Sequence, residues 1–454
     1  MELPFGSNFF RTLAVQFLLP TMRTSIVASL LLMAIVARSQ TGFNGPMPGY
    51  TSHMEVAIWL QCHGQCTAQL EYWPVNDPKD VRRTAELRSD AATAHVLKFF
   101  PAPLQHGTTY AYRVLIEGKP VIIPEQLQFK AQPIWRYRTD PPDFTIALGS
   151  CTYINEPDHD RPGDPYGGEY WIFDAIAEKK PDLMLWLGDN IYLREPDLSR
   201  TGFLHRYTHT RSAPELQKLL RSTHHYAIWD DHDFGPNDAD GSFEHSTMAK
   251  EMFGLFWVNP TVGVPGVEGI TTHFSHGDID FFLLDDRSFR VPGYMKTVEP
   301  QLLGKAQMDW LIQALKFSTS PFKMVVVGNQ VLNPTAVYEN YSTIPKEREE
   351  LLRRIEDEGI KGVVFLTGDR HYAELTELML KDGRVLRDFT VSPLTSGVMK
   401  REEENPLRVE GTKVQQRNFG TITFAGKRHE RVMTLRLFNS KGELLWEKAV
   451  GEER

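Results

Sequence analysis

The sequence has few cysteines, no long apolar run and no excess of basic residues. Three cysteines among 454 residues can form one disulfide at most, which excludes a disulfide-rich scaffold. No run reaches the ~18 apolar residues that a membrane-spanning helix needs. The 50 Lys and Arg against 58 Asp and Glu give a net charge of −8, so nucleic acid is not expected as the primary partner. With 41% hydrophobic residues, the chain is expected to be globular.

The N-terminus has the pattern of an export signal. Arg23 precedes an apolar stretch over residues 26–36, and Ala37-Arg38-Ser39 place small residues where a signal peptidase cleaves. We therefore expect residues 1–39 to be a signal peptide, with Met22 as an alternative start, and a periplasmic or secreted protein. The alternative is a buried N-terminal helix.

Two patterns divide the rest of the chain near residue 135. Between residues 49 and 129, short apolar runs are separated by turn residues, which is typical of an antiparallel β-sandwich. From Phe144 on, long apolar runs alternate with helical patterns, which indicates an α/β domain. We predict an N-terminal β-sandwich domain over residues 45–132 and a second domain over residues 140–454.

Local patterns give further expectations. Helical periodicity predicts helices over residues 168–180, 306–315 and 346–358, and three strands are expected after residue 418. Cys62 and Cys66 could close a small disulfide loop, with a metal site as the alternative.

Several histidines are expected to be structural or solvated. His224 and His225 precede an apolar run and are expected at the surface. His205 and His209 are expected to be solvated or packed, since no zincin-type Glu accompanies them. His159 lies in a loop rich in Pro, Gly and Asp, residues 155–168, which is a candidate to overhang a site.

Polar residues follow six apolar runs, each at the point where the run ends. Since buried strands of an α/β sheet read as continuous apolar runs, and ligands bind beyond their carboxyl ends, these residues are expected to share one site. The runs end in Gly149-Ser150-Cys151, Gly188-Asp189-Asn190-Ile191-Tyr192, Asp230-Asp231-His232-Asp233, Asp285-Asp286-Arg287, Gly328-Asn329-Gln330 and Gly368-Asp369-Arg370-His371.

These side chains indicate a metal centre. Clustered buried carboxylates repel one another unless a multivalent cation compensates them. Carboxylate and amide oxygens suit hard cations such as Ca²⁺, whereas thiolate, phenolate and imidazole point to a transition metal. The mixed set therefore suggests two unlike metals that share a carboxylate, an arrangement suited to phosphoryl transfer.

The motifs resemble those of the alkaline phosphatase D (PhoD-like) family within the metallophosphoesterase superfamily. Gly188-Asp189-xx-Tyr192 matches the GDxxY element of the purple acid phosphatase branch, and the other five strand ends look like the PhoD-like family over about residues 144–435. The resemblance implies an α/β fold with a four-layer αββα sandwich, preceded by a small all-β domain of the immunoglobulin or fibronectin type. It also implies hydrolysis of small phosphate esters by a metal-activated oxygen nucleophile.

The resemblance further implies a site that holds Fe³⁺ beside Ca²⁺. Asp189 would bridge the two ions, and Asp231 and Asp369 would hold Ca²⁺. Asn237 is a candidate ligand of a further Ca²⁺. Arg287 and Arg370 would bind phosphate oxygens, and His232 would protonate the leaving group. The iron ligands carried over are Cys151, Asp189, Tyr192 and His371.

The chain departs from most metallophosphoesterases at several ligand positions. Cys151 replaces the usual first Asp and His, Asp369 replaces the first His of GHxH, and Asn329-Gln330 stand where a His is expected. Each change replaces nitrogen by oxygen or sulfur, which favours Fe³⁺ with Ca²⁺ over two zinc ions.

Two other functions remain open on the sequence. A phosphodiesterase or phospholipase D-like activity could use the same site, because fold resemblance does not separate monoesters from diesters. A non-catalytic surface module that binds structural Ca²⁺ is the second alternative, although a purely structural calcium cage needs only oxygen ligands.

Overall fold

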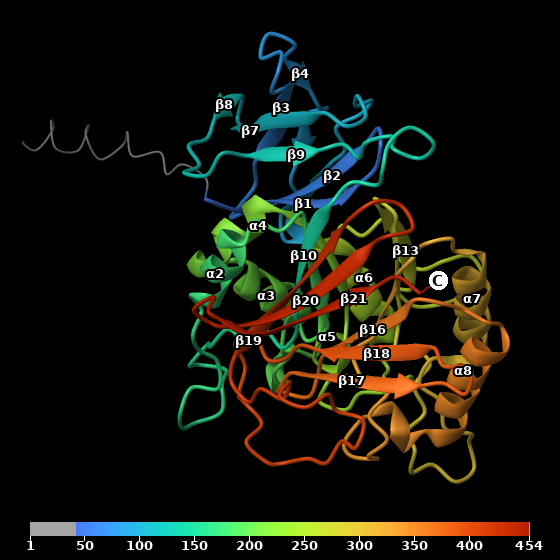
Figure 1. Cartoon of the computed structure of the whole chain (residues 1–454). Coiled ribbons are helices and arrows are strands. Elements are labelled where there is room, and N and C mark those ends of the chain that lie inside the picture. Colours follow the sequence, from blue (N-terminus) through green and yellow to red (C-terminus); the bar gives the residue numbers. More distant parts are fainter. Residues whose placement is uncertain (1–41, 454) are drawn as a thin grey trace, which may run out of the picture. The chain divides into compact units, whose positions relative to one another are not determined.

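The computed structural model describes residues 42–453 (Figure 1). The predicted signal peptide and the alternative start lie outside the described residues. Within the described range, no helix is both long and apolar enough to cross a membrane.

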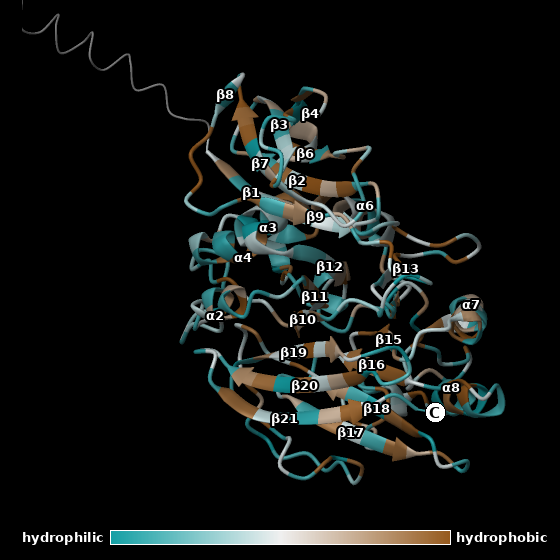
Figure 2. Ribbon diagram, turned by 45° about the horizontal axis from the view of Figure 1, so that its top comes forward, coloured by the Kyte–Doolittle hydropathy of each residue, from teal (hydrophilic) through white to brown (hydrophobic). Residues whose placement is uncertain are grey.

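The first part of the described chain forms two antiparallel sheets. One sheet has the strand order β1-β2-β6, and the other has the order β4-β3-β7-β8 with β5 and β9 at its margins. Side chains from both sheets, including Ile58, Leu70 and Tyr110, share one hydrophobic cluster, and Figure 2 shows hydrophobic residues along β2 and β7. A disulfide joins Cys62 to Cys66. The strands are β1 (Phe43–Thr51), β2 (Val56–Cys62), β3 (Thr67–Pro74), β4 (Arg82–Arg83), β5 (Leu87–Arg88), β6 (Val96–Phe99), β7 (Thr109–Ile116), β8 (Lys119–Pro120) and β9 (Gln128–Lys130).

Strand β1 is absent from the sequence-based prediction. Its sequence, FNGPMPGYT, contains two glycines and two prolines, which normally indicate a turn. The strand pairs only with β2, and its register shifts on both sides of Met47 and Pro48. An edge strand with such irregularities tolerates proline, because the missing N–H faces away from the ladder.

The second part of the chain contains two six-stranded sheets. Their strand orders are β12-β11-β10-β19-β20-β21 and β13-β14-β15-β16-β18-β17. Strands β10, β11 and β12 are parallel, and so are β14, β15, β16 and β18. The strands are β10 (Phe144–Gly149), β11 (Leu183–Leu187), β12 (His224–Ile228), β13 (Thr272–His276), β14 (Ile279–Leu283), β15 (Lys323–Val326), β16 (Val363–Thr367), β17 (Glu374–Met379), β18 (Val385–Thr390), β19 (Asn418–Ala425), β20 (Val432–Asn439) and β21 (Leu444–Gly451).

Together, two hydrophobic clusters contain side chains from both of these sheets and from the surrounding helices. Successive residues of β15 belong to different clusters. Met324 and Val326 belong to the cluster shared with the first sheet, and Val325 belongs to the cluster with α7 and α8. Figure 1 shows α7 and α8 beside β16 and β18. The helices are α2 (Ile172–Glu178), α3 (Arg200–Arg211), α4 (Gln217–Ser222), α5 (Asp231–Phe234), α6 (Ser246–Phe256), α7 (Gly304–Phe317) and α8 (Pro345–Asp357). The predicted helices over 168–180, 306–315 and 346–358 correspond to α2, α7 and α8.

The prediction that His224 and His225 lie at the surface is wrong. Both belong to β12 and are buried. The Nδ1 atom of His224 lies 2.8 Å from the carbonyl oxygen of Gly49 in β1, and Trp186 donates a hydrogen bond of 3.0 Å to His225. Burial lowers the pKa of His225 to about 3, so it is neutral in the folded protein.

The N-terminal sheets pack tightly on the α/β part at β1. The backbone N–H of Tyr50 donates to the carbonyl oxygen of Val258 at 2.9 Å. A β-carbon added at Gly49 would lie 2.6 Å from the same oxygen and 2.5 Å from the Val258 β-carbon. Gly49 therefore permits the close approach of the two backbones.

We expect Gly49→Ala to destabilise the protein by about 1–3 kcal/mol, because overpacking forces a backbone shift. The measurement is the free energy of unfolding from denaturant titration. Gly64→Ala is the matched control, since a β-carbon there meets nothing within 4 Å. Equal stabilities of the two variants would contradict the close-packing argument.

Candidate metal centre

The predicted polar residues lie where the carboxyl ends of parallel strands from both sheets meet. A β-carbon at Gly328, after β15, would lie 2.4 Å from Oδ2 of Asp230, which follows β12. One at Gly368, after β16, would lie 2.5 Å from Oγ of Ser150, which follows β10. These contacts cross from one sheet to the other. The strand ends thus converge, as the pattern of apolar runs predicts.

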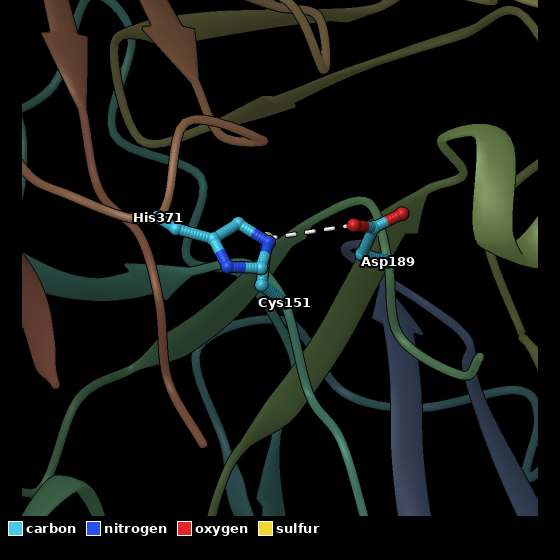
Figure 3. A group of neighbouring side chains, drawn as sticks. All are labelled: Cys151, Asp189 and His371. Atoms are coloured by element: carbon cyan, nitrogen blue, oxygen red, sulfur yellow. Dashed lines mark hydrogen bonds between the residues drawn. The ribbon is translucent and has the colours of Figure 1, made fainter. Parts of the chain in front are cut away.

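The first group of side chains combines sulfur, oxygen and nitrogen. Ligand atoms of Cys151, Asp189 and His371 lie within 4.8 Å of one another, and Figure 3 shows the three side chains as neighbours, with the hydrogen bond between Cys151 and Asp189 dashed. The Cys151 thiol donates to Oδ2 of Asp189 at 3.5 Å, and the Tyr192 hydroxyl donates to the same oxygen at 3.0 Å. The Tyr192 oxygen is 3.4 Å from Nε2 of His371. All four predicted iron ligands therefore lie together.

A second group shares Asp189 with the first. Ligand atoms of Asp189, Asp231 and His232 also lie within 4.8 Å of one another. The His232 backbone N–H donates to Oδ1 of Asp189 at 3.4 Å, and its ring lies 4.1 Å from the Tyr192 ring, centroid to centroid. Asp189 is thus placed between two sets of ligand atoms, which is the position required of a bridging carboxylate.

Unusual backbone conformations accompany these side chains. Cys151, Asp189, Asp369 and His371 have positive φ angles of 61°, 51°, 61° and 55°. Non-glycine residues rarely adopt this region, and such strain tends to occur at functional sites, where the surrounding structure imposes it. Cys151, Asp189 and Asp369 each lie two residues after the end of a strand, and His371 lies four residues after the end of β16.

Burial and mutual repulsion shift the pKa values of the cluster. Burial raises the pKa of the Cys151 thiol to about 12 and that of Asp369 to about 6. The pKa values of Asp189 and Tyr192 are raised well above their ordinary values by burial and by neighbouring acidic groups. Burial also opposes ionisation of Asp231, but His232 and Arg287 outweigh it and lower its pKa to about 2. Most of these groups would ionise readily only beside an added cation.

Neighbouring groups orient two of the predicted ligands. The Ser392 hydroxyl donates to the Cys151 sulfur at 3.1 Å. Nδ1 of His371 lies 2.6 Å from the carbonyl oxygen of Gly397, a contact that requires Nδ1 to carry the proton. The lone pair is then on Nε2, which faces Tyr192. Such partners are typical of metal-bound histidines, because they hold the ring in its binding tautomer.

The other predicted residues lie around this cluster. The Arg287 guanidinium is fully buried and pairs with Asp230 and with Glu339, the latter at 2.8 Å. Arg370 pairs with Glu403 at 2.5 Å and lies 4.4 Å from the centroid of the Tyr338 ring.

Asn237 is exposed on the turn after α5, next to Asp238, whose N–H donates to Asp231 at 2.7 Å. The ligand and catalytic roles of all these residues stay predictions.

The sequence analysis places Asn329 at the shared site without a ligand role, and it omits Glu339. Asn329 is fully buried, and neither its Nδ2 nor its Oδ1 has a hydrogen-bond partner among the described residues. Glu339 lies in the connection after β15, and its carboxylate is within 4.8 Å of those of Asp230 and Asp231. Its position at the end of an apolar run is the signal that places Asn329 at the site in the sequence analysis. Glu339 has no such signal, since it lies far from any strand end.

Two sheets whose strand ends gather carboxylate, thiol and imidazole side chains have the arrangement expected of a metallophosphoesterase-type enzyme. A sequence model of the PhoD-like phosphatase family matches residues 146–439. The chain therefore belongs to the PhoD-like phosphatase family, and it is a hydrolase that acts on phosphoester bonds.

Solved structures share the fold at low sequence identity. The structure of PhoD is 17% identical, with a TM-score of 0.70 over 91% of this chain and 92% of that chain. The purple acid phosphatase PPD1 from yellow lupin (Lupinus luteus) seeds is 12% identical, with a TM-score of 0.65 over 90% of this chain and 74% of that chain. A search of curated proteins finds no match.

Asn329 offers a test of the ligand cluster that does not depend on activity. In chelator-treated protein, we expect Asn329→Leu to raise the free energy of unfolding by about 1–3 kcal/mol, because it removes buried polar groups that lack partners. In untreated protein, the same change is expected to lower the metal content.

Asn333→Leu is the matched control for this change. Asn333 is equally buried, but it donates to Gln330 at 3.0 Å and accepts from the Thr335 N–H at 3.0 Å, so its replacement should destabilise the chelated protein. A similar loss of stability in Asn329→Leu would show that Asn329 is satisfied without metal.

Proposed function

We propose that this chain is an exported, metal-dependent phosphatase of the alkaline phosphatase D type that hydrolyses small phosphate esters at an Fe³⁺ and Ca²⁺ centre. The observation that carries the proposal is the buried cluster in which Asp189 lies between a sulfur-, phenol- and imidazole-containing group and a second, carboxylate-containing group. A mixed donor set of this kind suits two unlike cations.

The residues present fit both ions. Cys151, Tyr192 and His371 with Asp189 would hold Fe³⁺, since thiolate, phenolate and imidazole favour a transition metal. Asp189, Asp231 and Asp369 would hold Ca²⁺, together with the unpartnered Asn329 side chain. Asn237, beside Asp238, remains a candidate for a further Ca²⁺. When bound, the ions supply positive charge for the phosphate oxygens and lower the pKa of water to form the nucleophile.

Protein groups supply the remaining steps. His232 lies against Tyr192 and beside Asp189, and we assign it to protonate the leaving alkoxide. Burial lowers the pKa of His232 despite the opposing charge of Asp231, so the proton-donor role requires the negative charge of the bound phosphate to raise that pKa again.

We assign the phosphate contact to Arg370, because its Nε has no partner among the described residues. Arg287 is also a candidate from the sequence, but its three buried carboxylate partners, Asp230, Asp286 and Glu339, favour a structural role.

The finer architecture and location are part of this proposal. We infer that the two six-stranded sheets and their helices form a four-layer αββα sandwich over residues 140–454. We assign residues 45–132 to an immunoglobulin- or fibronectin-like domain. Export to the periplasm or the medium rests on the signal-like pattern of residues 1–39.

Metal removal tests the ligand assignment. We expect chelation to abolish phosphatase activity. We expect Cys151→Ala and Asp189→Ala each to lose bound iron and to lower the rate at least about 100-fold, because each removes a metal ligand rather than a residue that orients one. Element analysis measures the iron and calcium. Tyr192→Phe should lose the visible charge-transfer absorption of a tyrosinate–iron bond. Retention of full iron and full rate in Cys151→Ala would refute the assignment.

The role of His232 predicts a dependence on the leaving group. We expect His232→Asn to lower the rate on an alkyl phosphate monoester by about 10²–10⁴-fold, the usual contribution of a general acid. Little loss is expected on an aryl monoester, whose leaving group needs no proton. His429→Asn is the control, because His429 has an 87% exposed side chain. Equal losses on both substrates would exclude a proton-donor role.

The alternative functions are distinguished by the same substrates. Including an aryl diester separates phosphomonoesterase from phosphodiesterase or phospholipase D-like activity. Calcium without iron, combined with no turnover, would instead favour a non-catalytic Ca²⁺-binding surface module.

A further inference from the structure

A second group of possible ligands lies outside the proposed Fe/Ca centre. It consists of Glu156 and His159, in the loop over residues 155–168, and His205, in α3. Nε2 of His205 is 2.9 Å from Oε1 of Glu156, and Nδ1 of His159 is 3.1 Å from Oε2. The two imidazole rings are 5.3 Å apart, centroid to centroid. One ligand atom from each residue lies within 4.8 Å of the other two.

This donor set has a defined metal preference. Two imidazole nitrogens and one carboxylate oxygen suit zinc and other late divalent transition metals, whereas Ca²⁺ and Mg²⁺ prefer oxygen alone. Zinc sites with three protein ligands keep a further position for water. The His159 and His205 side chains are 34% and 44% exposed, so an ion can reach the group from solvent.

Arg206 positions the carboxylate and does not occupy the whole of it. Its guanidinium is fully buried, and Nε pairs with Asp197 at 2.7 Å while Nη1 pairs with Oε2 of Glu156 at 2.7 Å. Its Nη2 also lies 3.4 Å from Nδ1 of His159. Asp197 and Glu156 together carry two negative charges against the single charge of Arg206. Oε1 of Glu156 remains directed at His205, on the exposed side. Arg206 therefore acts as the kind of supporting partner that metal-bound carboxylates commonly have.

We propose that Glu156, His159 and His205 form a separate binding site for Zn²⁺ or a similar divalent transition metal. The ion would join the 155–168 loop to α3. The same loop contacts the main centre, because Tyr166 lies 3.2 Å, hydroxyl to Nδ1, from His371. It is also fixed by Asp160, which pairs with Arg194 at 2.9 Å. The bound ion would thus hold the loop in place beside the proposed active centre.

The experiment uses the full-length protein as purified, with its own metals in place. After desalting, the protein is titrated with Zn²⁺ by isothermal calorimetry, and iron, calcium and zinc are then measured by element analysis. We expect one equivalent of Zn²⁺ to bind in addition to the metals already present. His159→Ala and His205→Ala should each weaken this binding at least about tenfold, while iron and calcium remain unchanged.

His209→Ala is the matched control. His209 lies one turn after His205 in α3 and its ring is 6.2 Å from that of His205, but it is not one of the three proposed ligands. It should bind Zn²⁺ as the parent protein does. A second readout is limited proteolysis of the 155–168 loop, which Zn²⁺ should slow in the parent protein and in His209→Ala but not in His205→Ala.

Two results would overturn the proposal: no additional equivalent bound by the parent protein, or unchanged affinity in both His159→Ala and His205→Ala. Circular dichroism shows whether each variant is folded, and Glu156→Gln provides a further variant that keeps the side-chain shape. None of these measurements uses phosphatase activity, so failure of the proposed function would leave this test intact.

Discussion

The accumulation of acidic groups in a buried site is the constraint on which the rest of this structure depends. Asp189, Asp231 and Asp369 lie with a thiol and a phenol where two sheets meet, and burial raises the pKa values of most of them. Removing such groups from water is costly unless opposite charge compensates them. The fold therefore brings together side chains most of which ionise readily only beside a cation, as expected of a metal-dependent phosphatase.

Buried ion pairs next to the cluster hold its residues in position. Asp230 accepts from the backbone N–H of Asp231 at the start of α5 and forms an ion pair with the buried Arg287. Arg287 in turn pairs with Glu339. These interactions hold the first turn of α5, and hence Asp231 and His232, at a fixed position. Glycines at 328 and 368 allow the strand ends of the two sheets to approach closely enough to form one site.

The loop over residues 155–168 connects this site with the adjacent surface. Tyr166 packs against Gly397, where a β-carbon would lie 2.5 Å from its ring, and its hydroxyl contacts His371. The other end of the loop carries Glu156 and His159 toward α3. One short segment therefore contacts both groups of side chains.

The sequence by itself determined the strand ends and the chemistry of the centre. Continuous apolar runs followed by Cys151, Asp189 and Asp369 are local features, and the parallel pairing of β10 with β11 places the first two endings at one edge. Asp369 follows a strand of the other sheet and joins them only when the two sheets pack. The tertiary structure determines other features, which local sequence patterns do not encode. Strand β1 forms despite its prolines because β2 offers it an edge, and His225 is buried because Trp186 and α4 cover it. Glu339 acquires its partner Arg287 only when distant segments pack. Glu156 likewise meets His205 and Arg206 only in the folded chain, whereas its partner His159 lies three residues away in the sequence.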